Sequence, residues 1–172
     1  MKEKIQISGG TGLTAKDISS GKIFFTDDSL DCAYAWDTGV AVNRYLSELK
    51  NGRIIATECH QCKRVMLPPR LFCELCYIPS NNWLYVKDSG VINTYSICQV
   101  HWDASRIGED EKPYLPAVIE IDGASEGMGI MHLLGEVEPQ DLKIGMKVKA
   151  VWKPEAERIG SITDIKYFKP ID

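Results

Sequence analysis

The sequence lacks an apolar run long enough to cross a membrane, and it lacks an excess of positive charge. Its hydrophobic stretches fall short of the roughly 18 residues that a membrane helix needs, so we expect no membrane span. A net charge of −4 and a pI near 5.4 exclude the general attraction to nucleic acid that a basic domain provides. The start of the sequence lacks the apolar core of a signal peptide, which favours a cytoplasmic location with reduced cysteines.

Recognisable catalytic motifs are also missing. The Gly-rich run over residues 8–12 lacks the Gly-Lys-Ser/Thr ending and the preceding strand of a phosphate-binding loop, and a flexible arm is the better interpretation. We find no nucleophile–base motif and therefore predict no catalytic residue. Structural interpretations are favoured for the remaining reactive side chains: His101 and Asp103 at a strand end, His132 in an apolar run, and the thiols of Cys32 and Cys98.

Four of the six cysteines form two Cys-x-x-Cys pairs. Cys59 and Cys62 make the first pair, and Cys73 and Cys76 follow after ten intervening residues. Two such pairs on facing turns supply four thiolates for a tetrahedral site, with metal–sulfur distances of about 2.3 Å for zinc. A site of four cysteines leaves no open position for substrate, so we predict a structural Zn²⁺. His60 could replace one ligand, but four thiolates already suffice.

Iron in a rubredoxin-like site is the alternative metal, because thiolate tetrahedra suit iron as well as zinc. Redox knuckles usually carry Gly after the second cysteine of each pair, whereas this chain has Lys63 and Tyr77 there. This difference favours zinc. An iron-binding electron carrier would be red, so its colour would identify it.

The N-terminal part of the chain has helical patterns. Thr14 to Asp17 form a capping box that predicts a short helix ended by Gly21, and the apolar run 23–25 is interpreted as an anchor. A longer helix is predicted over 39–50, ended by Asn51-Gly52. Its buried stripe follows the i, i+3, i+4, i+7 spacing: Val42, Tyr45, Leu46 and Leu49.

The rest of the chain shows short strands separated by turn residues. We predict strands over 53–57, 65–67, 83–86, 91–100, 117–121, 129–134, 147–152 and 162–168, with a tight turn over 88–90. Several short strands without an intervening helix suit a small closed barrel, and the glycines at 123, 127, 129 and 135 fit its bends.

This order of helix, ribbon and barrel resembles the DUF35 family over roughly residues 40–170. Besides the cysteines, the matching segments are Tyr45-Leu46, Leu67-Pro68-Pro69-Arg70, Pro116-Ala117-Val118, Asp141 to Val148 and Phe168-Lys169-Pro170. The resemblance implies a mainly β protein with N-terminal helices, in which a rubredoxin-like zinc ribbon precedes a small OB-fold β-barrel. We expect an arm and helices over 1–52, the ribbon over 53–80 and the barrel over 81–172.

The resemblance also implies a function. Members of the family are similar in acting as accessory subunits of thiolases, 3-hydroxy-3-methylglutaryl-CoA synthases, acyl-CoA hydratases or steroid side-chain aldolases. The catalytic groups belong to the large subunit, and the coenzyme A thioester is bound in common with it. We therefore expect a hetero-oligomer with a thiolase-like or other acyl-CoA enzyme subunit, and the benzoylsuccinyl-CoA thiolase type is one candidate.

Three cations of the ribbon, Lys63, Arg64 and Arg70, are candidates for a CoA-binding or partner-binding surface. The phosphates of CoA require Arg or Lys, and Arg can bind two oxygens at once. Solvated charge that balances four thiolates around a metal is the alternative interpretation of the three residues.

A nucleic-acid-binding module is the alternative function, because OB-folds and zinc ribbons bind RNA or DNA in other proteins. Such a module needs a basic groove with exposed aromatic side chains. The acidic net charge opposes this interpretation.

Overall fold

The computed structural model describes residues 12, 14–21, 37–101, 105–108 and 110–171. The chain divides into two compact units, residues 1–36 and residues 37–172. In the first unit, helix α1 (Ala15–Ser19) begins with the predicted capping box, in which the Thr14 amide donates to the Asp17 carboxylate at 3.0 Å. The predicted apolar anchor 23–25 and Cys32 lie outside the described residues.

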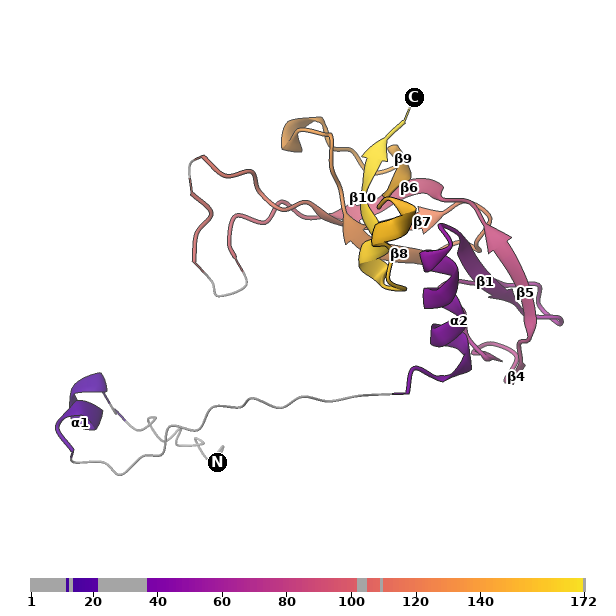
Figure 1. The fold of residues 1–172 in the computed structure, drawn as a ribbon, viewed down its shortest axis with the longest axis horizontal. Coiled ribbons are helices and arrows are strands. Elements are labelled where there is room, and N and C mark those ends of the chain that lie inside the picture. Colours follow the sequence, from indigo (N-terminus) through magenta and orange to yellow (C-terminus); the bar gives the residue numbers. More distant parts are fainter. Residues whose placement is uncertain (1–11, 13, 22–36, 102–104, 109, 172) are drawn as a thin grey trace, which may run out of the picture. The chain divides into compact units, whose positions relative to one another are not determined.

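Helix α2 (Gly39–Lys50) opens the second unit and lies beside strand β1 (Figure 1). The Asp37 carboxylate accepts a hydrogen bond from the Gly39 amide at 2.8 Å, which satisfies a free donor where the helix begins. The helix ends as predicted, at Gly52 in the left-handed conformation with φ of 71°. Tyr45 and Leu49 are buried, but Val42 is 46% exposed, so its assignment to the buried stripe was wrong.

The ribbon follows helix α2. Strand β1 (Ile54–Glu58) pairs antiparallel with β2 (Val65–Met66) on one side and with β5 (Asn82–Val86) on the other. Strands β3 (Phe72–Cys73) and β4 (Ile78–Pro79) form a separate small hairpin. Because β5 pairs with β1, the predicted turn over 88–90 does not close a hairpin with the next strand. Ser89 and Gly90 instead open strand β6.

The remaining strands form the predicted closed barrel. Its antiparallel sheet has the order β10 (Ile165–Pro170), β9 (Lys147–Trp152), β6 (Ser89–Tyr95), β7 (Pro116–Ile121) and β8 (Gly129–Leu133). A parallel bridge between Leu134 and Phe168 closes the ends, and the Gly135 amide donates to the Phe168 carbonyl at 2.9 Å. Short 3₁₀ helices occupy Pro139–Asp141, Glu155–Glu157 and Ile162–Asp164.

Two predicted strands are shorter than expected. The strand predicted over 91–100 ends at Tyr95, because the chain then leaves the barrel as a long arm that has no core to bury alternate side chains (Figure 1). The strand predicted over 162–168 begins only at Ile165. Residues 162–164 form a 3₁₀ turn, in which the Ser161 hydroxyl accepts a hydrogen bond from the Thr163 amide at 3.2 Å.

One apolar core joins the ribbon to the barrel. Leu49 of α2 and Ile55 of β1 belong to the same buried cluster as Ile119 and Phe168 of the barrel. Polar contacts reinforce the junction: the Val65 amide donates to the Ser125 hydroxyl at 2.9 Å, and the Ser125 amide donates to the Val65 carbonyl at 3.0 Å. The mainly β fold class is therefore confirmed, whereas the predicted boundaries at residues 52 and 80 stay predictions. No helix in the described part of the chain is long and apolar enough to cross a membrane.

We expect Asp164 to make the free energy of unfolding depend on pH in the acid range. Its fully buried carboxylate accepts hydrogen bonds from the amides of Ile159, Gly160 and Ser161 at 3.0, 2.8 and 3.0 Å. Burial opposes ionisation, but these hydrogen bonds outweigh it and hold the pKa below its usual value of 3.8. A lowered folded-state pKa adds stability at higher pH, and that stability is lost as the pH falls through the folded value.

Replacing Asp164 with Ala should therefore cost about 3 kcal/mol at pH 7, because three amide donors lose their acceptor. Asp164→Asn keeps one acceptor oxygen but does not titrate. Its stability loss, measured by urea unfolding, should be smaller at pH 7 and should shrink further below about pH 4. An Asp164→Asn variant with the wild-type acid profile would contradict this assignment.

Candidate metal centre

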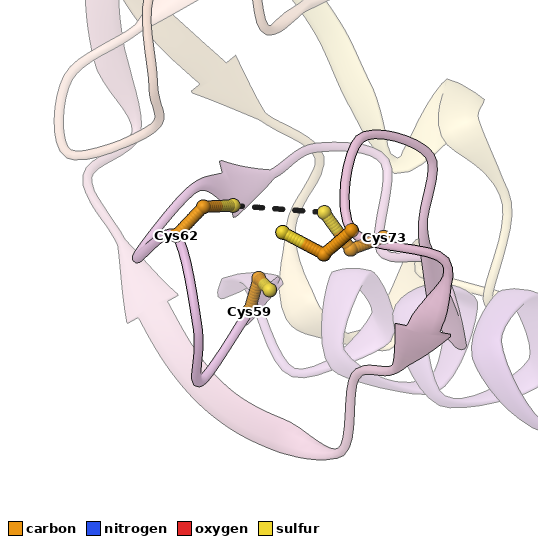
Figure 2. Close-up of side chains that lie close together, drawn as sticks. Cys59, Cys62 and Cys73 are labelled. Atoms are coloured by element: carbon orange, nitrogen blue, oxygen red, sulfur yellow. Dashed lines mark hydrogen bonds between the residues drawn. The ribbon is translucent and has the colours of Figure 1, made fainter.

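The four cysteines of the two Cys-x-x-Cys pairs meet at one end of the ribbon. All four sulfur atoms lie within 4.8 Å of one another, and Cys62 Sγ lies 3.6 Å from Cys73 Sγ. Figure 2 shows the side chains of Cys59, Cys62 and Cys73 pointing toward one another. A tetrahedron with bonds of about 2.3 Å places its sulfurs about 3.8 Å apart. The cluster could therefore hold a metal ion after small shifts of the sulfur atoms, whereas His60 is exposed.

Two matching turns position the sulfurs. The Lys63 amide donates to the Cys59 carbonyl and the Tyr77 amide to the Cys73 carbonyl, both at 2.9 Å. Lys63 and Tyr77 are left-handed, with φ of 62° and 55°, a conformation that normally favours Gly. The backbone thus takes the same path that Gly would allow, so the lack of Gly does not discriminate zinc from iron. The choice of zinc stays a prediction.

The cysteines of the cluster differ in how readily their thiols ionise. The pKa of Cys59 is lowered to about 6, mainly because the Cys62 amide donates a hydrogen bond to its sulfur. Burial opposes this effect, and a hydrogen bond from the Gln61 amide adds to it. Burial and the neighbouring cysteine sulfurs raise the pKa of Cys76 to about 12. A raised pKa favours the protonated thiol of Cys76, and a cation between the sulfurs would favour its thiolate. Metal binding must release protons, so we expect metal affinity to fall with decreasing pH.

Each of the three predicted cations forms an ion pair within the ribbon. Arg64 and Arg70 share one oxygen of Glu74, at 3.4 and 3.3 Å, and Lys63 lies 3.6 Å from Glu58. The Glu74 carboxylate accepts a hydrogen bond from its own backbone amide, and this lowers its pKa. Burial acts in the opposite direction, and the neighbouring Arg70 and Arg64 lower the pKa further. Two guanidinium groups on one carboxylate oxygen leave donors for a further anion.

A second group of cations was missed by the sequence analysis. Arg53, Lys87 and Lys149 line a groove of about 590 Å³ between the ribbon and the barrel, together with the Asp88 carboxylate. Asp88 lies 3.9 Å from Lys149 Nζ. The Arg53 guanidinium stacks over Tyr85 at 4.8 Å. These positions are far apart in the sequence, and only the pairing of β1 with β5 and of β6 with β9 brings them together.

Two of the three histidines, His101 and His132, have polar partners in the structure. His132 Nδ1 accepts a hydrogen bond from the Leu133 amide at 2.9 Å, and its Nε2 lies 3.2 Å from the Ile162 carbonyl oxygen. His101 Nε2 lies 3.2 Å from Glu111 Oε2, whereas Asp103 is outside the described residues. Neither histidine lies beside a nucleophile in these contacts.

Comparisons with known proteins agree with this architecture. Residues 83–153 match the family model described as ChsH2, C-terminal OB-fold domain. A DUF35 domain-containing scaffold protein of Methanocaldococcus jannaschii is 32% identical over 122 residues, which cover 69% of this chain and 82% of the relative. A scaffold protein of the same description from Methanothermobacter thermautotrophicus is 27% identical, over 68% and 86% of the two chains.

A third relative is a longer protein than this chain. A probable enoyl-CoA hydratase alpha subunit of Thermomonospora curvata is 28% identical over 65% of this chain, but the match spans only 34% of that relative.

Two solved structures share the fold. A DUF35 protein of unknown function from Sulfolobus solfataricus has a TM-score of 0.60 and 23% identity, over 78% of this chain and 87% of the other. A chain of the Ltp2-ChsH2(DUF35) aldolase has a TM-score of 0.54 and 22% identity, over 80% and 98% of the two chains. The identity, the coverage of the scaffold relatives, the OB-fold match and the four-cysteine ribbon agree: the chain belongs to the DUF35 family.

Proposed function

We propose that this chain is a non-catalytic, zinc-binding accessory subunit of an acyl-CoA enzyme complex. The observation that carries the proposal is a closed four-cysteine ribbon fused to an OB-fold of the ChsH2 type. Relatives with this domain are named as scaffold proteins and as an enoyl-CoA hydratase subunit, and a solved neighbour is part of an aldolase. A thiolase-like large subunit is the proposed partner, and a benzoylsuccinyl-CoA thiolase is one such assembly.

The metal has a structural role in this proposal. Zinc bound by Cys59, Cys62, Cys73 and Cys76 would supply folding free energy to a segment whose own apolar cluster is small. That cluster is Cys59, Met66 and Cys73, with Cys76 and Ile78 against it. Because the ligand set is closed, the reacting groups belong to the large subunit. We propose a cytoplasmic location, where the thiols stay reduced.

The two groups of cations have different roles in the proposal. Three cations, Arg53, Lys87 and Lys149, line the groove with one carboxylate, Asp88. Arg53 is paired with Glu48 at 2.7 Å, so we assign the phosphates of a CoA thioester shared with the partner mainly to Lys87 and Lys149. The ribbon cations Lys63, Arg64 and Arg70 already have carboxylate partners within the ribbon. We assign them to the surface that meets the large subunit.

Removing the groove cations should weaken CoA binding selectively. The double variant Lys87→Ala/Lys149→Ala should raise the Kd of the assembled complex for a CoA thioester about tenfold, because two exposed cation–phosphate contacts are lost. Arg64→Ala/Arg70→Ala is the comparison variant; measured with enough large subunit to keep the complex assembled, it should change this Kd less than threefold. Isothermal titration calorimetry on the complex measures the Kd of both double variants. A larger increase in Kd for the ribbon variant than for the groove variant would indicate that the ribbon cations bind CoA.

The accessory role is tested by purifying the tagged full chain from its native cells at moderate salt, with mass spectrometry of the retained proteins. Stoichiometric recovery of an acyl-CoA enzyme subunit is the expected result. Recovery of the chain alone, or with nucleic acid that survives high salt, would contradict the proposal.

A further inference from the structure

The two knuckles of the ribbon share a backbone but present different surfaces. In the first knuckle, the exposed side chains His60, Gln61 and Lys63 are polar. In the second, Phe72 is 62% exposed, Leu75 60% and Tyr77 85%, and Leu71 is exposed beside them. The first knuckle shows that the turn does not require apolar side chains at its outer positions. Their presence in the second knuckle therefore needs another explanation.

These four side chains belong to one compact loop. The turn is closed by the Tyr77 amide bonded to the Cys73 carbonyl at 2.9 Å, and the Ser80 amide donates to the Leu71 carbonyl at 2.7 Å. Phe72 pairs with Pro79 across the small hairpin. We name this the knuckle patch: Leu71, Phe72, Leu75 and Tyr77. Several large apolar side chains exposed on one loop are a candidate interaction site.

We propose that the knuckle patch is the anchor by which this chain docks on the large acyl-CoA enzyme subunit, in an apolar hollow bordered by carboxylates. This inference rests on the proposed function and assigns the contact surface that the accessory role requires. The charges beside the patch specify the partner. Arg64 and Arg70 share a single oxygen of Glu74, so their remaining donors fit a further carboxylate.

The area of the knuckle patch indicates the kind of interface to which it belongs. Side chains exposed to this degree contribute on the order of 100 Å² each, so the patch covers about 400 Å². A standard interface buries about 800 Å² on each partner. The patch is thus the central part of a larger protein interface rather than a whole one, with the arginines as its border.

The charges oppose two other occupants. An anionic membrane surface attracts clusters of several cations, whereas Lys63, Arg64 and Arg70 lie beside Glu58 and Glu74, which together leave a net charge of only +1 there. A second copy of this chain, docked through the same face, would bring two arginine pairs together, and like charges in an interface are costly. A partner that supplies carboxylates has neither disadvantage.

The test uses the large subunit recovered with the full chain in the affinity purification, expressed and purified as the binding probe. The double variant Phe72→Ser/Leu75→Ser should raise the Kd by about 100-fold or more, because both side chains are exposed anchors. Met131→Ser is the matched control: Met131 is 73% exposed on barrel strand β8, and its replacement should change the Kd less than threefold. Thermal unfolding of each variant establishes that the fold is retained.

A photocrosslinker gives an independent measurement. With p-benzoylphenylalanine in place of Tyr77, crosslinks to the large subunit are expected, whereas the same group in place of Gln61 should give few. A Kd within threefold of wild type for Phe72→Ser/Leu75→Ser, or crosslinks from position 61 rather than 77, would overturn the docking surface and leave the accessory role standing. Purification without an acyl-CoA enzyme would overturn the accessory role itself, and the docking proposal with it.

The remaining occupants are tested with the chain alone. Patch-dependent binding to phosphatidylserine vesicles would overturn the proposal in favour of a membrane. Patch-dependent dimerisation in analytical ultracentrifugation would overturn it in favour of a second copy.

Discussion

Replacing Cys73 with Ala is expected to remove the bound metal completely and to unfold the ribbon. Cys73 is fully buried and supplies one of four sulfurs that lie within 4.8 Å of one another. Structural zinc sites contribute on the order of 10 kcal/mol to folding, which exceeds what the small apolar cluster around Met66 could replace. Metal content by mass spectrometry should fall from one zinc per chain to zero.

The matched control is Cys98→Ala. Cys98 lies outside the metal cluster, and its half-buried thiol lies 3.9 Å from the Ser96 hydroxyl. This variant should retain one zinc and a Tm close to that of the wild type. A Cys73→Ala protein that kept full zinc content would show that the cluster is not the metal site, and iron in place of zinc would revive the electron-carrier alternative.

Gly90→Ala is expected to be the most damaging single change in the barrel. Gly90 is buried in strand β6 and pairs with both β7 and β9. A Cβ at this position would overlap the carbonyl oxygen of Glu120 and lie 2.9 Å from its carbonyl carbon. Backbone cannot move aside as a flexible side chain can, so we expect a loss of about 4 kcal/mol in the free energy of unfolding. For a chain of this size, that loss lowers the Tm by about 10 °C.

Gly108→Ala serves as the control for Gly90→Ala. A Cβ at Gly108 would find its nearest atom 3.9 Å away, on the Glu111 side chain, so the substitution should be nearly neutral. Gly129→Ala should act in the same direction as Gly90→Ala, since its Cβ would overlap the Ile119 carbonyl oxygen. An unchanged Tm for Gly90→Ala would mean that β6 and β7 are farther apart than described here.

Local patterns were sufficient to predict much of the molecule. The spacing of the cysteines predicted a cluster because each Cys-x-x-Cys pair closes its own turn, independent of the rest of the fold. Helix 39–50 was predicted with the bounds that α2 has, because Gly52 provides a left-handed end. The closed barrel followed from the alternation of short strands, and the structure confirms it.

Features that depend on pairing between distant segments were missed. Gly90 was interpreted as a turn residue, but its role is the close approach of Glu120 in a neighbouring strand. Val42 fits the helical stripe by spacing, yet it is exposed, whereas Tyr45 and Leu49 contribute to the core. The groove cations Arg53, Lys87 and Lys149 form no sequence motif, so strand pairing was needed to bring them together.

Strand β5 has a consequence for how this protein can evolve. The OB-fold family model begins at residue 83, within β5, yet β5 forms its hydrogen bonds with β1 of the ribbon, from Ile54–Val86 to Glu58–Asn82. A recombination event between residues 80 and 81 would therefore separate a strand from its only described sheet neighbour and would expose Ile54 and Ile55. Helix α2, ribbon and barrel should be inherited together, substitutions in β1 and β5 should covary, and gene fusions should join this unit to other proteins before residue 39.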